Sequence, residues 1–341
     1  MRMTLTYRQK FRLKKAGKWL LILLLAILAA LIVFLLYVER YVVYTDTGAH
    51  IDYHKSSSRL QAGATSPATS TEPLGQVEII YEEPSSNPNG QEPASGYFIT
   101  TQDLADAASL LPRIEALDSG STVMLELKDD EGRFYYPTSL SNAQTAEVDL
   151  NAVSQIITTL RQQDCTVVAS IPAFSDNAFA LESPACALPL SDGSLWTSGD
   201  GFYWLDPADD TVIDYLEQIM LELSSMNISE VVFTNFYFPD SQNIDYDTEA
   251  SRLQITAAAA KQLSGYFSGS NLTVSFATDG VNFPMEGLSG RLFIEDADAA
   301  QLERFAAAYG SEDWDAATNL VFLTSSKDSR FDAYTTLRPL P

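Results

Sequence analysis

Residues 150–171 read LNAVSQIITTLRQQDCTVVASI and contain one unit of the pattern that decides the fold. Leu150–Gln162 carries apolar residues at helical spacing, and Thr166–Ile171 is a short apolar run typical of a buried strand. The same alternation continues from Gly96 to the end of the sequence. It predicts repeated βα units around a parallel sheet.

Seven apolar runs are predicted strands: Tyr97–Thr100, Val123–Leu127, Thr166–Ile171, Val231–Phe236, Leu272–Phe276, Arg291–Ile294 and Leu320–Thr324. The predicted helices between them are Leu104–Leu117, Leu150–Gln162, Thr211–Ser225, Ser251–Tyr266 and Ala299–Ala308.

This number of units indicates an α/β fold of the (β/α)8 barrel type over residues 96–341, since such barrels take about 250 residues. One strand is unassigned and Asp279–Gly290 is short for a helix, so the barrel is expected to be incomplete or irregular. A doubly wound open sheet is the alternative. No glycine-rich phosphate loop follows the first strand, where Thr100–Asp103 stands, which favours the barrel.

The ends of the chain differ sharply in charge. The formal net charge is -24, yet residues 1–18 hold seven basic side chains and no acid, which leaves -31 on the rest. Such an acidic body would repel a phosphate backbone, so nucleic-acid binding is excluded.

His50 and His54 are the only histidines. A Ser-His-Asp triad or a histidine-rich metal site in the main body is therefore excluded as well, and we expect neither metal nor cofactor.

Residues 19–38 form an uninterrupted apolar run of 20 residues, long enough to cross a bilayer. We predict a transmembrane signal-anchor helix, because the run is longer than the apolar part of a cleaved signal peptide, the alternative reading. The basic segment 1–18 would stay in the cytoplasm and the main domain would lie outside, at the cell membrane. Residues 39–95 are predicted to form a hairpin and a Ser/Thr/Pro-rich linker. Cys165 and Cys186 could pair or stay reduced.

The working residues of such a barrel come from the carboxyl ends of its strands. Glu126 and Lys128 follow the second strand on one side of it. The third strand leads into a long loop, 177–207, expected to be a lid or binding loop. The remaining polar and aromatic candidates at these exits and in this loop are Asp129, Asp176, Trp196, Trp204, Thr234, Asn235, Tyr237, Asp279, Glu295 and Asp296.

Several of these segments occur together in one known family. They are Glu126–Gly132 (ELKDDEG), Phe174–Asp176 (FSD), Asp192–Trp196 (DGSLW), Trp204–Pro207 (WLDP), Tyr215 and Phe238–Pro239. In this order and spacing the chain resembles, from Gly96 to about Glu295, the glycosyl-hydrolase domain of bacterial cell-envelope proteins, an amylase-like barrel. The resemblance implies a polysaccharide or oligosaccharide as partner.

The chain departs from that family at the fourth strand. The family pattern F-D-Y-x-R-F-P is here Phe233–Pro239 (FTNFYFP), with Thr234 at the aspartate position and Tyr237 at the arginine position. The resemblance implies that the aspartate would be the catalytic carboxylate, and a threonine cannot ionise to take that role. A degenerate catalytic site is therefore expected.

Three hypotheses follow. A glycosidase would use two carboxyls, with candidates Glu126, Asp279 and Glu295, about 5–5.5 Å apart for retention or about 6.5–9.5 Å for inversion. A non-catalytic binding protein would use a groove lined by aromatic side chains without paired acids. The predicted substrate-binding residues are Lys128, Asp129, Asp176, Trp196, Trp204, Thr234, Asn235 and Tyr237. A scaffold that recruits a protein partner would show an exposed apolar patch away from the mouth.

Overall fold

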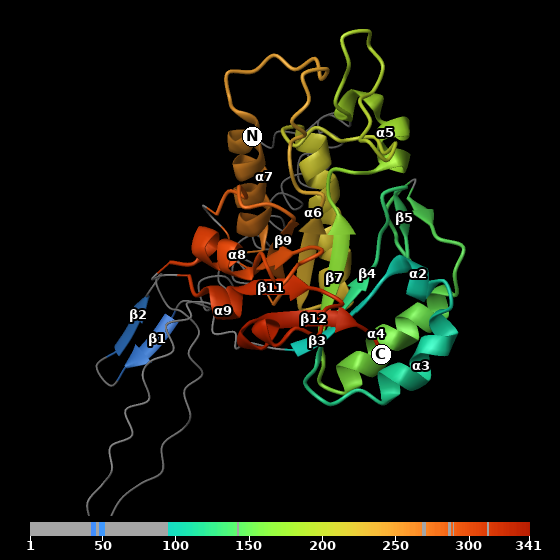
Figure 1. Ribbon diagram of the computed structural model, residues 1–341, viewed down its shortest axis with the longest axis vertical. Coiled ribbons are helices and arrows are strands. Elements are labelled where there is room, and N and C mark those ends of the chain that lie inside the picture. Colours follow the sequence, from blue (N-terminus) through green and yellow to red (C-terminus); the bar gives the residue numbers. More distant parts are fainter. Residues whose placement is uncertain are drawn as a thin grey trace, which may run out of the picture. The chain divides into compact units, whose positions relative to one another are not determined.

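The computed structural model describes residues 42–45, 48–51, 95–141, 143–267, 271–285, 288, 290–311 and 314–341 (Figure 1). The chain divides into two units, Met1–Ile80 and Tyr81–Pro341. In the first unit, β1 (Val42–Thr45) pairs antiparallel with β2 (Gly48–Ile51) as a short hairpin.

The predicted basic segment 1–18, the transmembrane helix 19–38 and most of the linker lie outside the described residues. Within the described residues, every helix is too short or too polar to cross a membrane.

The second unit is a closed barrel of eight parallel strands, which confirms the predicted fold class. In barrel order the strands are β3 (Ser95–Ile99), β4 (Thr122–Glu126), β7 (Thr166–Pro172), β8 (Glu230–Thr234), β9 (Thr273–Thr278), β10 (Leu292–Ile294), β11 (Leu320–Leu323) and β12 (Thr335–Pro339). Strand β12 pairs with β3 and closes the ring.

The expectation of an incomplete barrel was wrong, because the eighth strand has no apolar run by which it could be predicted from the sequence. Residues 335–339 read TTLRP, with one aliphatic side chain, an arginine and a proline. Thr335 and Thr336 are nevertheless buried. β-branched threonine fits a pleated strand, and proline is tolerated at a strand end, so this segment completes the barrel without an apolar run.

Helices surround the strands (Figure 1). They are α2 (Thr101–Leu104), α3 (Ala107–Glu115), α4 (Leu150–Gln162), α5 (Asn177–Glu182), α6 (Asp210–Ser225), α7 (Arg252–Tyr266), α8 (Leu302–Tyr309) and α9 (Ala316–Asn319). The predicted helix 104–117 corresponds to α3, which begins at Ala107; a capping box at Thr100 starts the separate helix α2 three residues before the predicted start. As expected, the connection from β9 to β10 contains no helix among its described residues.

The interior of the barrel is a layer of apolar side chains, one from most strands. These are Met124, Val168, Val232, Ala277, Phe293, Val321 and Leu337. A larger apolar cluster fills the space between strands and helices. Cys165 and Cys186 are buried free thiols.

An ion pair lies two residues before this layer, toward the amino ends of the strands. Arg291 and Glu230 are 4% and 2% exposed, and the guanidinium donates to both carboxylate oxygens. The hydroxyl of Ser275 donates to the same carboxylate. Because side chains alternate along a strand, all three point into the barrel below the apolar layer. They close its lower end with polar groups that satisfy one another.

We expect Arg291→Met to destabilise the protein by about 3–5 kcal/mol, since it leaves Glu230 buried without its partner. The double variant Glu230→Gln/Arg291→Met should recover a large part of that loss. Denaturant unfolding of the full-length protein measures both. Arg330→Met, at an exposed pair with Asp328, is the control and should leave the unfolding midpoint unchanged. If Arg291→Met were as stable as the wild type, that result would contradict this account of the Glu230–Arg291 pair.

Candidate active site at the barrel mouth

The register of the strands determines which side chains meet at the mouth. Two residues beyond the apolar layer, the next inward positions are Glu126 on β4, Thr234 on β8, Asp279 after β9 and Glu295 after β10. Since the strands are parallel, their carboxyl ends lie at one end of the barrel. The three acids predicted to be catalytic are therefore brought to the same mouth.

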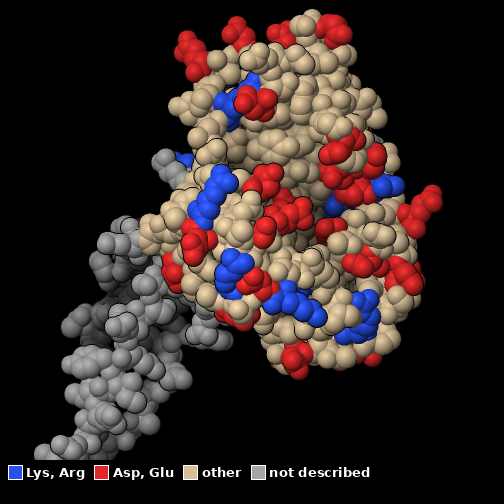
Figure 2. Space-filling view, in the orientation of Figure 1, with Lys and Arg blue, Asp and Glu red and all other residues tan. Residues whose placement is uncertain are grey.

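A cavity of about 180 Å³ lies directly above the apolar layer. Its walls include Glu126, Asp130, Thr234, Asn235 and Glu295. A longer cleft of about 1050 Å³ shares Asn235 and Glu295 with this cavity and runs past Tyr237 and Asp279. Figure 2 shows Asp and Glu side chains around a hollow in the visible face of the molecule.

Glu295 is the acid whose protonation the site changes most. Its pKa is raised from 4.5 to about 7. Burial is the largest cause, and the negative charges of four neighbouring carboxylates add to it: Asp279, Asp296, Glu126 and Asp130. At neutral pH this group can therefore carry a proton, as a general acid must.

Glu126 is held in place by the start of α2. Its Oε2 accepts a hydrogen bond of 2.7 Å from the backbone N–H of Thr101. Burial raises the pKa of Glu126, while the hydrogen bonds from Thr101 oppose that rise. The carboxylate is thus fixed in direction at the cavity wall.

Asp130 is oriented by Asn235. The side-chain Nδ2 of Asn235 donates to Oδ1 of Asp130 over 2.6 Å. Asn235 has a φ of 50°, a left-handed conformation that asparagine tolerates better than most residues. Burial raises the pKa of Asp130, and the charge of Lys128 and the bond from Asn235 lower it. Asn235 therefore acts on the site by positioning a carboxylate.

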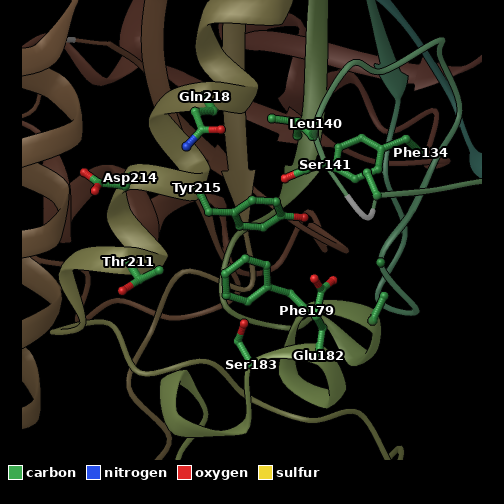
Figure 3. A pocket seen from close by; sticks show the side chains of 13 residues that line it. Phe134, Leu140, Ser141, Phe179, Glu182, Ser183, Thr211, Asp214, Tyr215 and Gln218 are labelled. Carbon is green, nitrogen blue, oxygen red and sulfur yellow. The ribbon is translucent and has the colours of Figure 1, made fainter.

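Lys128 and Asp176, both predicted to bind substrate, form a buried ion pair of 2.9 Å with no side-chain exposure. Lys128 also donates to the carbonyl of Pro172, and Asp176 accepts from the hydroxyl of Tyr215. In Figure 3, Tyr215 projects from α6 beside Phe179 of α5, and their rings stack at 4.3 Å. This network anchors the start of the long loop to the barrel beside the cavity, whose wall includes Lys128.

Asp129 lines the cavity wall, but its carboxylate is engaged by Arg133 at 2.8 Å. Asp130 was missed in the prediction of site residues. The two-residue period that places Glu126 and Lys128 on one side continues to position 130, so extending it by one step would have found Asp130.

The aromatic candidates differ in accessibility. Trp204 is 2% exposed and donates its indole N–H to the carbonyl of Tyr237 over 3.0 Å. Trp196 meets Trp204 edge-on at 6.0 Å and borders a separate hollow of about 590 Å³. Tyr237 packs on Trp204 and is 48% exposed at the long cleft. Tyr237 is thus the aromatic surface that a ligand in the cleft would meet.

Among the described residues, no group of three or more His, Cys, Asp or Glu side chains is placed to hold a metal ion.

Comparison with known proteins places the barrel in a family. Residues 96–276 match the family described as "Putative glycosyl hydrolase domain", and the chain belongs to that family. The resemblance inferred from the sequence is confirmed. No curated protein matches the sequence.

Solved structures of similar fold include glycosidases. An alpha-galactosidase from Lactobacillus brevis has a TM-score of 0.52 and 13% identity, over 74% of this chain and 38% of that one. The galactosidase domain of an alpha-galactosidase-sucrose kinase has a TM-score of 0.50 and 15% identity, over the same shares. The chain thus spans 38% of the length of these two structures, and at such identity the likeness shows the fold alone.

We expect Glu295 to titrate with a pKa of about 7, and Asp279→Asn to lower that pKa because it removes a neighbouring negative charge. Carboxyl-carbon NMR of the full-length protein measures both. The folded pKa lies above that of the unfolded chain, so the folded state holds the extra proton and stability falls as pH rises from about 4.5 through about 7. Glu295→Gln should remove this part of the pH dependence. Titration of Glu295 near 4.5 would contradict the assignment.

Proposed function

We propose that this protein is a carbohydrate-active barrel that binds a polysaccharide of the cell envelope and hydrolyses it with Glu295 as proton donor. The observation that carries the proposal is one cavity in which Glu295, with a pKa of about 7, lies with Glu126 and Asp130. Paired acids at the mouth are the feature that a glycosidase needs.

The chemistry divides between the two kinds of acid. The protonated carboxyl of Glu295 donates its proton to the glycosidic oxygen as the bond to the anomeric carbon breaks. An ionised carboxylate, Glu126 or Asp130, supports the positive charge that develops on the sugar and activates water or attacks the anomeric carbon. The hydrogen bonds from Thr101 and Asn235 direct these two carboxylates.

A binding protein with a degenerate catalytic site is the second candidate, and Thr234 favours it. The family resemblance puts the catalytic aspartate at this position, where the inward side chain is a hydroxyl. A barrel mouth without that carboxylate could still hold a glycan through its polar walls and Tyr237. A non-catalytic scaffold that recruits a protein partner has less support, since the described site features lie at the mouth.

A hydrolysis and binding screen of the full-length protein on α- and β-linked hexose and hexosamine oligosaccharides separates the candidates. If the wild type hydrolyses a glycan, Glu295→Gln should lower kcat by about 10²–10⁴-fold, and the rate should fall as pH rises through about 7. Glu303→Gln, an exposed acid on α8, is the matched control and should retain the rate.

The same screen includes Thr234→Asp and its non-ionising counterpart Thr234→Asn. If the wild type binds a glycan and only Thr234→Asp hydrolyses it, the wild-type protein has a degenerate catalytic site and is not a glycosidase. Binding without hydrolysis in every variant would leave a glycan-binding protein. Absence of binding to every glycan would overturn both candidates.

We also propose the arrangement that the sequence predicts around the barrel. Residues 1–18 lie in the cytoplasm, 19–38 anchor the chain in the lipid bilayer, and 39–95 link the anchor to an extracytoplasmic domain at 96–341. The cation-rich first segment and the apolar run of 20 residues support it.

Alkaline phosphatase fused after residue 341 should be active, because this reporter folds only outside the reducing cytoplasm. The same reporter fused before residue 1 of the full-length chain should be inactive. Activity of the second fusion and silence of the first would reverse the proposed orientation.

A further inference from the structure

The long cleft beside the cavity has an unusual balance of charge. Its described walls, with those of the cavity, carry six carboxylates that no Lys or Arg of the described residues pairs with: Glu126, Asp130, Asp200, Asp279, Glu295 and Asp296. A ligand that enters this cleft therefore meets an excess of negative charge, even when Glu295 holds its proton.

The two cations of these walls are paired with other carboxylates, although the charge of Lys128 also lowers the pKa of Asp130. Lys128 is committed to Asp176, and Arg252 pairs with Asp240 and donates to the carbonyls of Pro239 and Ser241. An anionic glycan such as a uronate or a phosphate-bearing polymer would be repelled by the six unpaired carboxylates. A sugar with an ammonium group would meet unpaired acceptors.

Tyr237 lines the long cleft together with Asp200, Asp279 and Glu295. Burial raises the pKa of its phenol, and so do the charges of Asp279, Asp130, Asp200 and Glu295. Its half-exposed ring offers a face on which a sugar ring can stack.

We infer that the long cleft binds amino sugars with free amines, and that the glycan of this protein contains N-unsubstituted hexosamine units. The inference rests on the proposed carbohydrate function and names its substrate class. Asp200, Asp279 and Asp296, all exposed at the cleft, accept from the ammonium groups, while Tyr237 stacks on a ring. The smaller cavity with Glu126 and Asp130 remains the place of bond cleavage.

Matched glycans test the inference on the full-length protein. Calorimetry compares tetrasaccharides of β-1,4- and β-1,6-linked glucosamine with their N-acetylated forms, which share the backbone and lack the charge. We expect the amine form to bind about tenfold more tightly than the acetylated form. This preference should shrink as NaCl rises from about 0.05 to about 0.5 M.

Variants of the cleft identify where the preference arises. Tyr237→Arg places a cation among the acids and should reduce the preference to less than about twofold, whereas Tyr237→Phe should keep it. Asp279→Asn should weaken the amine form only. Glu303→Gln lines neither cavity and should change nothing, which separates binding in the cleft from attraction to an acidic surface.

Equal affinity for the charged and acetylated forms would overturn the inference and leave the carbohydrate function standing. A preference that survives Tyr237→Arg would also overturn it, because the amines would then bind elsewhere. Failure of every tetrasaccharide to bind would count against the proposed function itself.

Discussion

The alternation of side chains along parallel strands is the constraint on which the rest of this molecule depends. On three neighbouring strands the inward-facing residues have the same order from the amino end to the carboxyl end. An ionic or polar residue comes first, then an apolar residue of the interior layer, then a residue of the mouth. Strand β10 and the residues on either side of it show this order with Arg291, Phe293 and Glu295. A shift of one residue in any register would exchange interior and exterior, so the same packing that makes the core also fixes the acids of the site.

This constraint explains why burial and charge accumulate together at the mouth. The apolar layer beneath Glu295 removes water from one side of its carboxyl, and neighbouring strands bring further carboxylates to the other. Each strand contributes little alone. The close ring of strand ends produces a proton-holding acid from ordinary glutamate, without histidine and among groups that would each ionise readily in water.

The sequence allowed the class of fold and the main acids to be predicted, because both depend on local periodicity. Apolar runs located seven strands, and their ends located Glu126, Asp279 and Glu295. The eighth strand was not predicted because its buried residues include threonines, and their burial depends on contacts with strands that are distant in sequence. The structural roles of Lys128, Asp176 and Trp204 were not predicted for a similar reason. Their partners, including Tyr215 and the backbone of Tyr237, are distant in sequence. The burial of these side chains therefore could not be predicted from the neighbouring residues.

The pairing of β12 with β3 has a consequence for how the barrel is made. Thr336 lies opposite Ser95, more than two hundred positions earlier in the chain, so this ladder has the longest loop to close. Until it forms, β3 and β12 are open sheet edges with unpaired backbone groups, which invite pairing with other chains. The barrel is thus most exposed to aggregation just before its ring is complete, and a long contact separation of this kind makes that step slow.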